Sequence, residues 1–196
     1  MVLFHKNLPF FSCYEVCGEL ILTYLKGFVH FFMINLLVNK KVNFLVSPNG
    51  IGKSTLIKAI LNLISYKGLI ITNLASFAYC PEKVLLPEYL KVKDFLNLFD
   101  INETKKQNLL ALFKVNENLY LKNLSKGMHQ KVLLIQALAV DADGYFFDEP
   151  LNGLDKQSEC VFIAEIKKLY NIGKMIIISS HYVERYNEIN CNIIEL

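Results

Sequence analysis

Charged residues are scarce in this sequence, at 20% of 196 residues, while hydrophobic residues make up 53% and the mean hydropathy is +0.31. A chain so rich in apolar residues can bury a large core, which excludes an intrinsically disordered protein. The length leads us to expect one domain rather than two fused copies. The longest apolar stretch, residues 20–38, contains Lys26, His30 and Asn35. A central lysine costs a membrane helix about 2.5–3.5 kcal/mol, so we expect no transmembrane helix there.

The sequence also lacks the signals of several other classes of protein. We find no basic N-terminal segment followed by an apolar core and a small-residue cleavage site, so secretion is not expected. The five cysteines are irregularly spaced and form no Cys-x-x-Cys pair, which favours buried, reduced thiols over zinc ligands or disulfides. The 21 basic and 18 acidic residues are scattered, so we expect no nucleic-acid partner. Repeats and low-complexity linkers are absent as well, which favours a single unit.

What the sequence does contain is an alternation of apolar runs and helix-like segments. Strands are predicted at residues 33–38, 42–47, 69–78, 144–147, 175–179 and 192–196, the first two forming a hairpin or tight connection. Helices are predicted at residues 53–65, 127–139 and 157–170, with a helical subdomain inserted at about 83–124. Continuous apolar strands alternating with helices indicate an α/β fold whose mainly parallel sheet is covered on both faces.

A glycine-rich loop lies between a predicted strand and a predicted helix. It matches G-x-x-x-x-G-K-[ST], except that Ser47 replaces the first glycine. Such a loop directs backbone N–H groups at phosphate oxygens near the positive end of a helix dipole. Lys53 is expected to reach the β- and γ-phosphates, and the Ser54 hydroxyl to ligate Mg²⁺. The residues expected to bind the nucleotide are Asn49, Gly50, Ile51, Gly52, Lys53, Ser54 and Thr55. A glycine-rich turn before an ordinary helix is the simpler alternative.

Two carboxylates follow the apolar run at residues 144–147, namely Asp148 and Glu149. In open α/β folds, ligands bind at the carboxyl ends of the strands. Asp148 is therefore a candidate Mg²⁺ ligand, and Glu149 is a candidate for polarising an attacking water. The alternative is a strand that ends in a solvated Asp-Glu turn.

Together these features resemble the nucleotide-binding subunits of ATP-binding cassette (ABC) transporters, over nearly the whole chain from about Tyr24 onward. The segment that separates this family from other P-loop proteins is its L-S-G-G-Q signature with a basic helix after it. Its counterpart here is Leu124-Ser125-Lys126-Gly127-Met128-His129-Gln130-Lys131. In the family's order follow Asp148-Glu149-Pro150, Gly153-Leu154-Asp155 and Ser179-Ser180-His181. The resemblance implies one nucleotide-binding domain over residues 1–196, with a P-loop NTPase fold and an abbreviated antiparallel β-subdomain.

The resemblance also implies roles for further residues. Tyr24 would stack on adenine, although a tyrosine of the core is the alternative. Ser125 and Gly127 would contact the γ-phosphate of an ATP held by a second subunit, either the same chain or a related cassette, in a head-to-tail dimer. Asp155 would cross the interface between the two subunits. His181 would hold the γ-phosphate and position the catalytic glutamate and the water.

The sequence departs from the family pattern at a few positions. If Ser47 needed a left-handed backbone, the strain would be about 1–2 kcal/mol. Glu82 occupies the position of a glutamine that touches Mg²⁺ and the attacking water. A carboxylate can ligate Mg²⁺, but it adds negative charge near the γ-phosphate, so we expect slower hydrolysis or altered coupling. Lys126 and Met128 replace Gly and Gln of the signature, in a form similar to that of some exporters.

The function implied by the resemblance is an ATPase subunit that uses ATP and Mg²⁺ to energise a separate transmembrane permease, with an exporter favoured by the signature. Such a subunit is cytoplasmic and peripheral on the inner face of the cell membrane. The permease would dock near residues 82–99, where the apolar residues form either an exposed docking surface or a subdomain core; they are Val84, Leu85, Leu86 and Tyr89. Two alternatives are a soluble ABC-type ATPase without transport and a nucleotide-dependent switch with slow turnover.

Overall fold

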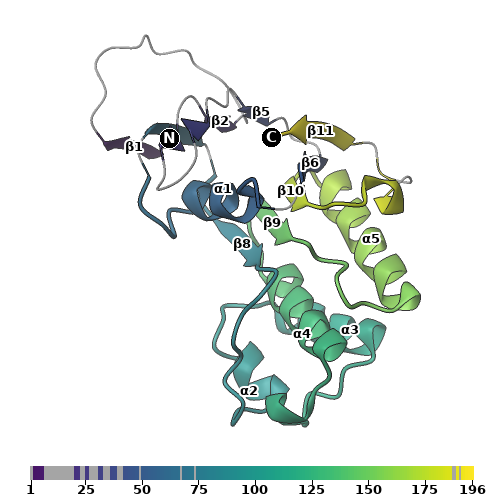
Figure 1. The fold of residues 1–196 in the computed structure, drawn as a ribbon. Coiled ribbons are helices and arrows are strands. Elements are labelled where there is room, and N and C mark those ends of the chain that lie inside the picture. The colour runs from purple at the N-terminus through teal and green to yellow at the C-terminus, as the bar shows by residue number, and fades with distance from the viewer. Residues whose placement is uncertain are drawn as a thin grey trace.

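Five apolar runs form one parallel sheet, in the order β11-β6-β10-β9-β8 (Figure 1). Its strands are β6 (Val42–Val46), β8 (Phe77–Cys80), β9 (Gly144–Asp148), β10 (Met175–Ser179) and β11 (Cys191–Glu195). Side chains alternate between the two faces of a strand, so Tyr145 and Phe147 pack on one face of the sheet and Phe146 packs on the other. The inner strands β9 and β10 are buried on both faces along their whole length, which explains why they read as continuous apolar runs.

The computed structural model describes the backbone of residues 2–6, 20–22, 25–26, 31–32, 36–38, 42–48, 50–66, 68–72, 74–186, 189 and 191–196. Two predicted site residues, Tyr24 and Asn49, lie outside the described residues, as do Cys13 and Cys17.

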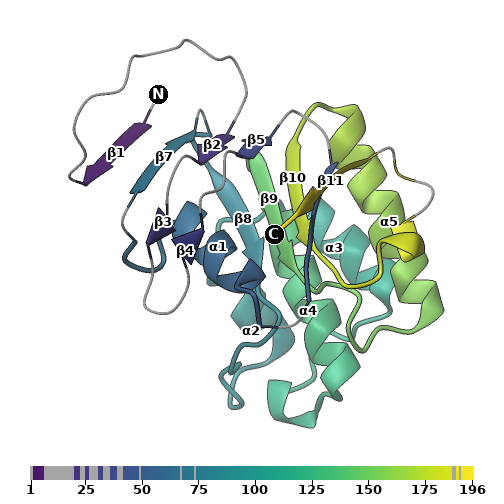
Figure 2. The same cartoon turned by 45° about the horizontal axis from the view of Figure 1, so that its top comes forward.

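Helices cover both faces of the parallel sheet, as Figures 1 and 2 show. They are α1 (Lys53–Ile60) on one face, and α4 (Lys126–Ala139) and α5 (Lys156–Asn171) on the other. The first helix is shorter than the predicted 53–65, because Asn62 adopts a left-handed backbone with φ +55° and ends it. The apolar residues of α5 face the sheet as expected, with Phe162 and Ile166 fully buried.

A second, antiparallel sheet has the order β1-β7-β2-β5, with strands of three to five residues. These strands are β1 (Val2–Lys6), β2 (Leu20–Leu22), β5 (Leu36–Val38) and β7 (Gly68–Thr72), and a separate pair is formed by β3 (Leu25–Lys26) and β4 (Phe31–Phe32). Of the hairpin or tight connection predicted between residues 33–38 and 42–47, the hairpin is wrong, because β5 pairs with β2 whereas β6 pairs with β10 and β11. The single strand predicted at 69–78 is also wrong, since β7 and β8 belong to different sheets.

Short helices fill the region between β8 and α4. They are α2 (Val92–Leu96), α3 (Glu103–Phe113) and the 3-10 turn η1 (Leu121–Asn123), while a second 3-10 turn, η2 (Val183–Tyr186), follows β10. Val92, Phe95 and Leu109 are buried as their spacing predicts. The helical spacing of Leu109, Leu112 and Phe113 predicts one apolar face, but Leu112 is exposed, because Leu109, Leu110 and Phe113 form the buried face of α3.

The cysteines differ from one another in burial. Cys80 is buried and Cys191 is half-buried, but Cys160 lies exposed on α5, so the expectation of a buried thiol is wrong for Cys160. Within the described part of the chain, no helix combines the length and the apolar character needed to cross a membrane.

Candidate functional site

The glycine-rich loop connects the end of β6 to the first residue of α1, as the sequence predicts. Gly50 and Gly52 have φ values of +85° and +111°, which glycine adopts with little cost and other residues rarely adopt. A Cβ atom on Gly50 would meet no atom within 4 Å. Glycine is therefore required at this position by the backbone conformation, and the adjacent space is open to a ligand.

Ser47 occupies its position in the loop without a left-handed backbone. Among the described residues other than glycine, only Asn62, Lys114 and Glu149 have a positive φ. The carbonyl oxygen of Ser47 accepts a hydrogen bond of 2.8 Å from Nζ of Lys53. The loss of the first motif glycine therefore introduces no left-handed strain.

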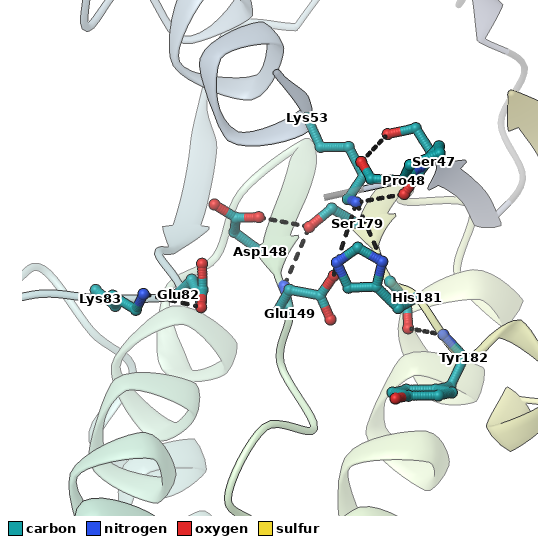
Figure 3. A network of polar contacts seen from close by, with 11 residues as sticks. Ser47, Pro48, Lys53, Glu82, Lys83, Asp148, Glu149, Ser179, His181 and Tyr182 are labelled. Carbon is teal, nitrogen blue, oxygen red and sulfur yellow. Dashed lines mark hydrogen bonds and ion pairs between the residues drawn. The ribbon is translucent and has the colours of Figure 1, made fainter. Parts of the chain in front are cut away.

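Lys53, His181 and Glu149 converge from three separate elements (Figure 3). Nε2 of His181 lies 3.2 Å from Nζ of Lys53 and 3.2 Å from Oε1 of Glu149. An unprotonated Nε2 accepts a hydrogen bond from Lys53. Oε1 of Glu149 is buried and accepts no hydrogen bond from the described residues. The helix start, the turn after β9 and the turn after β10 therefore meet at one place, the carboxyl edge of the parallel sheet.

Glu149 is held in an unusual environment directly after β9. Its backbone has a φ of +49°, a conformation that costs a residue with a side chain about 1–3 kcal/mol. Burial raises the pKa of Glu149 to about 7, with Lys53 opposing the rise and Asp148 adding to it. A carboxyl group with a pKa near neutrality can take up and release a proton at neutral pH, which is the requirement for a general base.

Asp148 is the last residue of β9 and is 2% exposed. Its Oδ1 accepts a hydrogen bond of 2.5 Å from the hydroxyl of Ser179, the last residue of β10. The same hydroxyl accepts a hydrogen bond from the backbone N–H of Glu149 at 3.1 Å. The sequence motif pointed to Ser179 only as a neighbour of His181, although a serine at the end of an apolar strand is a visible signal.

The oxygen donors that the sequence assigns to Mg²⁺ can be compared with the needs of that ion. Asp148 contributes a buried carboxylate, Ser54 a half-buried hydroxyl, and Glu82 a carboxylate on the Asp148 side of the site (Figure 3). Glu82 also forms an ion pair of 3.6 Å with Lys83. Among the described residues, no three His, Cys, Asp or Glu side chains form a metal cluster. The available oxygen atoms suit Mg²⁺, which uses one or two carboxylates together with substrate phosphates.

The signature-like segment forms the start of α4. The hydroxyl of Ser125 caps this helix by accepting a hydrogen bond of 3.3 Å from the backbone N–H of Met128. Gly127 lies against the backbone of Gly153. Within the described part of the chain, no hydrogen bond or ion pair links Ser125 or Gly127 to Lys53. Their expected contact with a nucleotide on another subunit stays a prediction.

Asp155 has well-defined partners within its own chain. One carboxylate oxygen accepts a hydrogen bond of 2.8 Å from the backbone N–H of Ser158 and so caps α5. The other lies 2.7 Å from Nζ of Lys131 on α4. These contacts hold the pKa of Asp155 far below its usual range. The expected contact across a dimer interface stays a prediction, and the observed function of the carboxylate is to join α4 to α5.

Gln130 supports the site although no sequence pattern gave it a role. Its buried side chain donates a hydrogen bond of 3.2 Å to the carbonyl oxygen of Pro150, so α4 supports the turn that carries Glu149. Of the other predicted nucleotide-binding residues, Ile51 is half-buried and Thr55 is exposed on α1. Both lie in or next to the loop, and their contacts with a nucleotide also stay predictions.

Comparison with protein families gives one matching model, described as ABC transporter, over residues 34–152. This match begins before the glycine-rich loop, contains the signature-like segment and ends after Glu149.

Several curated relatives match about three quarters of the chain. The ABC transporter ATP-binding protein YthP of Bacillus subtilis is 37% identical over 159 residues, covering 74% of this chain and 66% of its own. The zinc import ATP-binding protein ZnuC of Acinetobacter baylyi is 36% identical, covering 70% and 56%. The manganese transport system ATP-binding protein MntB of Halalkalibacterium halodurans is 30% identical, covering 72% and 67%. The aligned region thus spans between about half and two thirds of these relatives.

Solved structures share the same fold. The structure described as the ATP binding subunit of an ABC transporter has a TM-score of 0.81 and 26% identity, covering 91% of this chain and 86% of its own. A chain from the complex of archaeal ribosomal stalk protein aP1 with ribosome recycling factor aABCE1 has a TM-score of 0.78, covering 98% and 39%. Its identity is 21%, so this second likeness concerns the fold alone. The predicted α/β fold class is confirmed.

Proposed function

The chain belongs to the ABC transporter family of ATP-binding proteins, and on that premise we propose that it hydrolyses ATP to energise a separate membrane permease. One observation carries the proposal. His181 lies 3.2 Å from both Lys53 and Glu149, and Glu149 directly follows the buried Asp148 in the chain. A cation for phosphate, a base with a raised pKa and a carboxylate for Mg²⁺ are the groups that phosphoryl transfer to water requires.

Each residue has a defined part in the proposed reaction. Magnesium, when bound with the nucleotide, neutralises charge on the phosphate oxygens. Glu149 accepts a proton from the water whose oxygen attacks the γ-phosphorus, and the bond from that phosphorus to the bridging oxygen of ADP breaks. To pair with the phosphates, Lys53 exchanges its bonds to the Ser47 carbonyl oxygen and to His181. His181 is then free to orient the water and the γ-phosphate.

We propose that two such subunits enclose the nucleotides head to tail. The first turn of α4 presents Ser125 and Gly127 at a helix N-terminus, which is an anion site. The second subunit is either another copy of this chain or a related cassette.

The permease is proposed to contact an apolar surface patch formed by Val84, Leu85 and Tyr89. Their side chains are 49%, 99% and 78% exposed, on the connection between β8 and α2. Leu86 instead packs against the hydrophobic core. Three large apolar side chains so exposed at nearby positions favour a docking surface over a subdomain core. On this proposal the subunit is cytoplasmic and lies on the inner face of the membrane.

For the direction of transport, we propose import of a divalent metal ion. The names of two relatives specify zinc import and manganese transport, and those relatives align over 146 and 168 residues. Lys126 and Met128 favour an exporter, but these two positions carry less weight than the sequence identity that the chain shares with the two metal-transport relatives over their aligned regions.

The hydrolysis proposal is tested by comparing the wild-type chain with Glu149→Gln. Both proteins should bind ATP, but only the wild type should release phosphate at an appreciable rate. A matched control is Glu165→Gln, which removes a carboxylate that pairs with Lys168 on α5. If wild type turns over no faster than Glu149→Gln while both bind ATP, the proposal fails.

The docking proposal is tested in cell membranes by cross-linking and identifying the partner. Leu85→Asp should abolish recovery of a membrane permease, because it places a charge in the apolar patch. Ile172→Asp, at a position 65% exposed beyond the end of α5, should leave recovery unchanged. Equal recovery with both variants would contradict docking at this patch.

A further inference from the structure

We propose that Ser179 is a positioning residue of this site, whose hydroxyl fixes both the Asp148 carboxylate and the turn that presents Glu149. The inference rests on the proposed ATP hydrolysis, for which these two carboxylates are the essential acidic groups. It gives a function to a serine that otherwise belongs only to the sequence around His181.

The location of Ser179 follows from the register of the sheet. Strands β9 and β10 are parallel neighbours, and their last residues, Asp148 and Ser179, are paired. Ser179 is fully buried. The four residues before it in β10 are Met175 and three isoleucines, so the hydroxyl is a polar group in an apolar strand. Burying a hydroxyl without hydrogen bonds is costly, so its partners matter to the fold as well as to the site.

The Ser179 hydroxyl can donate only one hydrogen bond, and the Asp148 carboxylate can only accept. Oγ of Ser179 donates to Oδ1 of Asp148 at 2.5 Å, and its lone pairs accept the backbone N–H of Glu149 at 3.1 Å. The same N–H also lies 3.1 Å from the Ser179 carbonyl oxygen. Figure 3 shows the second oxygen of Asp148 pointing away from Ser179. Because Ser179 holds Oδ1 of Asp148, the second oxygen of this carboxylate is available to a metal ion.

The second bond acts on the backbone of Glu149. The φ of +49° at Glu149 is a strained conformation that persists only where surrounding contacts determine it. The bonds from its N–H to Ser179 are contacts of that kind. One side chain therefore couples the orientation of the proposed metal ligand to the position of the proposed base.

The chain contains a natural control for this arrangement at the opposite end of β9. Ser76, just before β8, donates from its hydroxyl to Oδ2 of Asp143 at 3.2 Å and accepts the Asp143 backbone N–H at 3.1 Å. This is a similar pair of bonds between a serine and the segment around an aspartate on a neighbouring strand. Ser76 is exposed and lies at the amino ends of the parallel strands, far from the carboxyl edge that carries the site.

The experiment compares Ser179→Ala, Ser179→Cys and Ser76→Ala in the full chain. Partners of metal ligands, when removed, cost about ten- to hundredfold in metal affinity or activity. We expect Ser179→Ala to lower kcat by about tenfold or more with KM for ATP changed less than about twofold. Ser179→Cys should be intermediate, because a thiol is a weak donor. Ser76→Ala should match the wild type.

A second measurement does not depend on turnover. In a Glu149→Gln background, binding of trinitrophenyl-ATP is titrated with Mg²⁺, and Ser179→Ala should raise the half-saturating Mg²⁺ concentration by about tenfold. A merely structural serine would lower the melting temperature without moving this concentration. An unchanged Mg²⁺ midpoint would overturn the inference, whatever the loss of stability. Because this titration needs only nucleotide binding, it decides the role of Ser179 even if the wild type fails to hydrolyse ATP.

Discussion

A Cβ atom on Gly127 would lie 2.5 Å from the carbonyl oxygen of Gly153, so the first turn of α4 and the loop after β9 are in direct backbone contact. That loop begins at Glu149 and ends at Asp155, the residue that caps α5. The ion pair between Lys131 and Asp155 joins the same two elements. The signature-like segment and the proposed catalytic glutamate are therefore linked within one chain by close packing.

Gly127→Ala should disrupt this contact, because real Cβ atoms do not approach an oxygen to 2.5 Å. The loop after β9 must move, and we expect the free energy of unfolding to fall by about 1–3 kcal/mol. ATP hydrolysis should fall at least tenfold in the fraction that remains folded, since Glu149 moves with its loop. Urea denaturation and phosphate release are the two measurements.

The control for this substitution is Gly173→Ala, at a glycine with φ +76° where an added Cβ would have no atom within 4 Å. Its left-handed backbone gives a cost in stability of about 1–2 kcal/mol without any steric contact. Hydrolysis should be retained by this protein. Equal hydrolysis by Gly127→Ala and Gly173→Ala would show that the contact with Gly153 does not matter for catalysis.

The raised pKa of Glu149 makes stability depend on pH. Its pKa rises from an ordinary 4.5 to about 7, so the folded chain binds more protons than the unfolded chain between these values. The free energy of unfolding contributed by this group therefore falls as pH rises through that window. The two proteins are compared without nucleotide and without Mg²⁺. The free energy of unfolding of Glu149→Gln minus that of wild type should increase by about 2 kcal/mol from pH 5 to pH 8. Denaturation curves of both proteins at the two pH values measure this change. A difference between the proteins that is the same at pH 5 and pH 8 would contradict the prediction.

Glu82→Gln should accelerate hydrolysis. The negative charge of Glu82 contributes to the raised pKa of Glu149 and would lie near the phosphates of the nucleotide. Replacing it with an amide removes that repulsion and supplies a donor. We expect kcat to rise about threefold, which corresponds to less than about 1 kcal/mol. Glu88→Gln, an exposed position further along the same connection, should leave kcat unchanged. A slower Glu82→Gln protein would indicate that the carboxylate itself is needed.

Ser47→Gly should not improve nucleotide binding, even though it restores the motif. The φ of Ser47 is not positive, so glycine relieves no strain and only adds freedom to the unfolded chain. We expect a loss of about 0.5–1 kcal/mol in stability and an ATP affinity within about twofold of wild type. Gly50→Ala, where φ is +85°, should instead lose about tenfold or more in affinity. Isothermal titration with ATP measures the affinity of both variants, and denaturation measures their stability. A Ser47→Gly protein that binds ATP more tightly than wild type would contradict the backbone argument.

Much of the fold could be predicted from the sequence because its strands are buried on both faces. The runs at 144–147 and 175–179 are continuous and apolar, and they became β9 and β10 within one residue of the expected bounds. The strands in the N-terminal half are harder to predict, because strand pairing depends on residues that lie far apart in the sequence. Nothing in residues 33–47 indicates that β5 pairs with β2 while β6 pairs with β10 and β11. Leu112 shows the same limit at one helix position, since only packing decides which turn of α3 faces the core.

The chemistry of the loop, the order of the motifs and the α/β class follow from residue types at short spacings, so they could be inferred from the sequence alone. Tertiary structure decided which groups meet: Lys53 reaches His181 across 128 positions, and Ser179 reaches Asp148 across 31. It also decided the raised pKa of Glu149 and the backbone conformation at Ser47. Proximity, burial and φ arise from the whole packed chain, and no local pattern of residues specifies them.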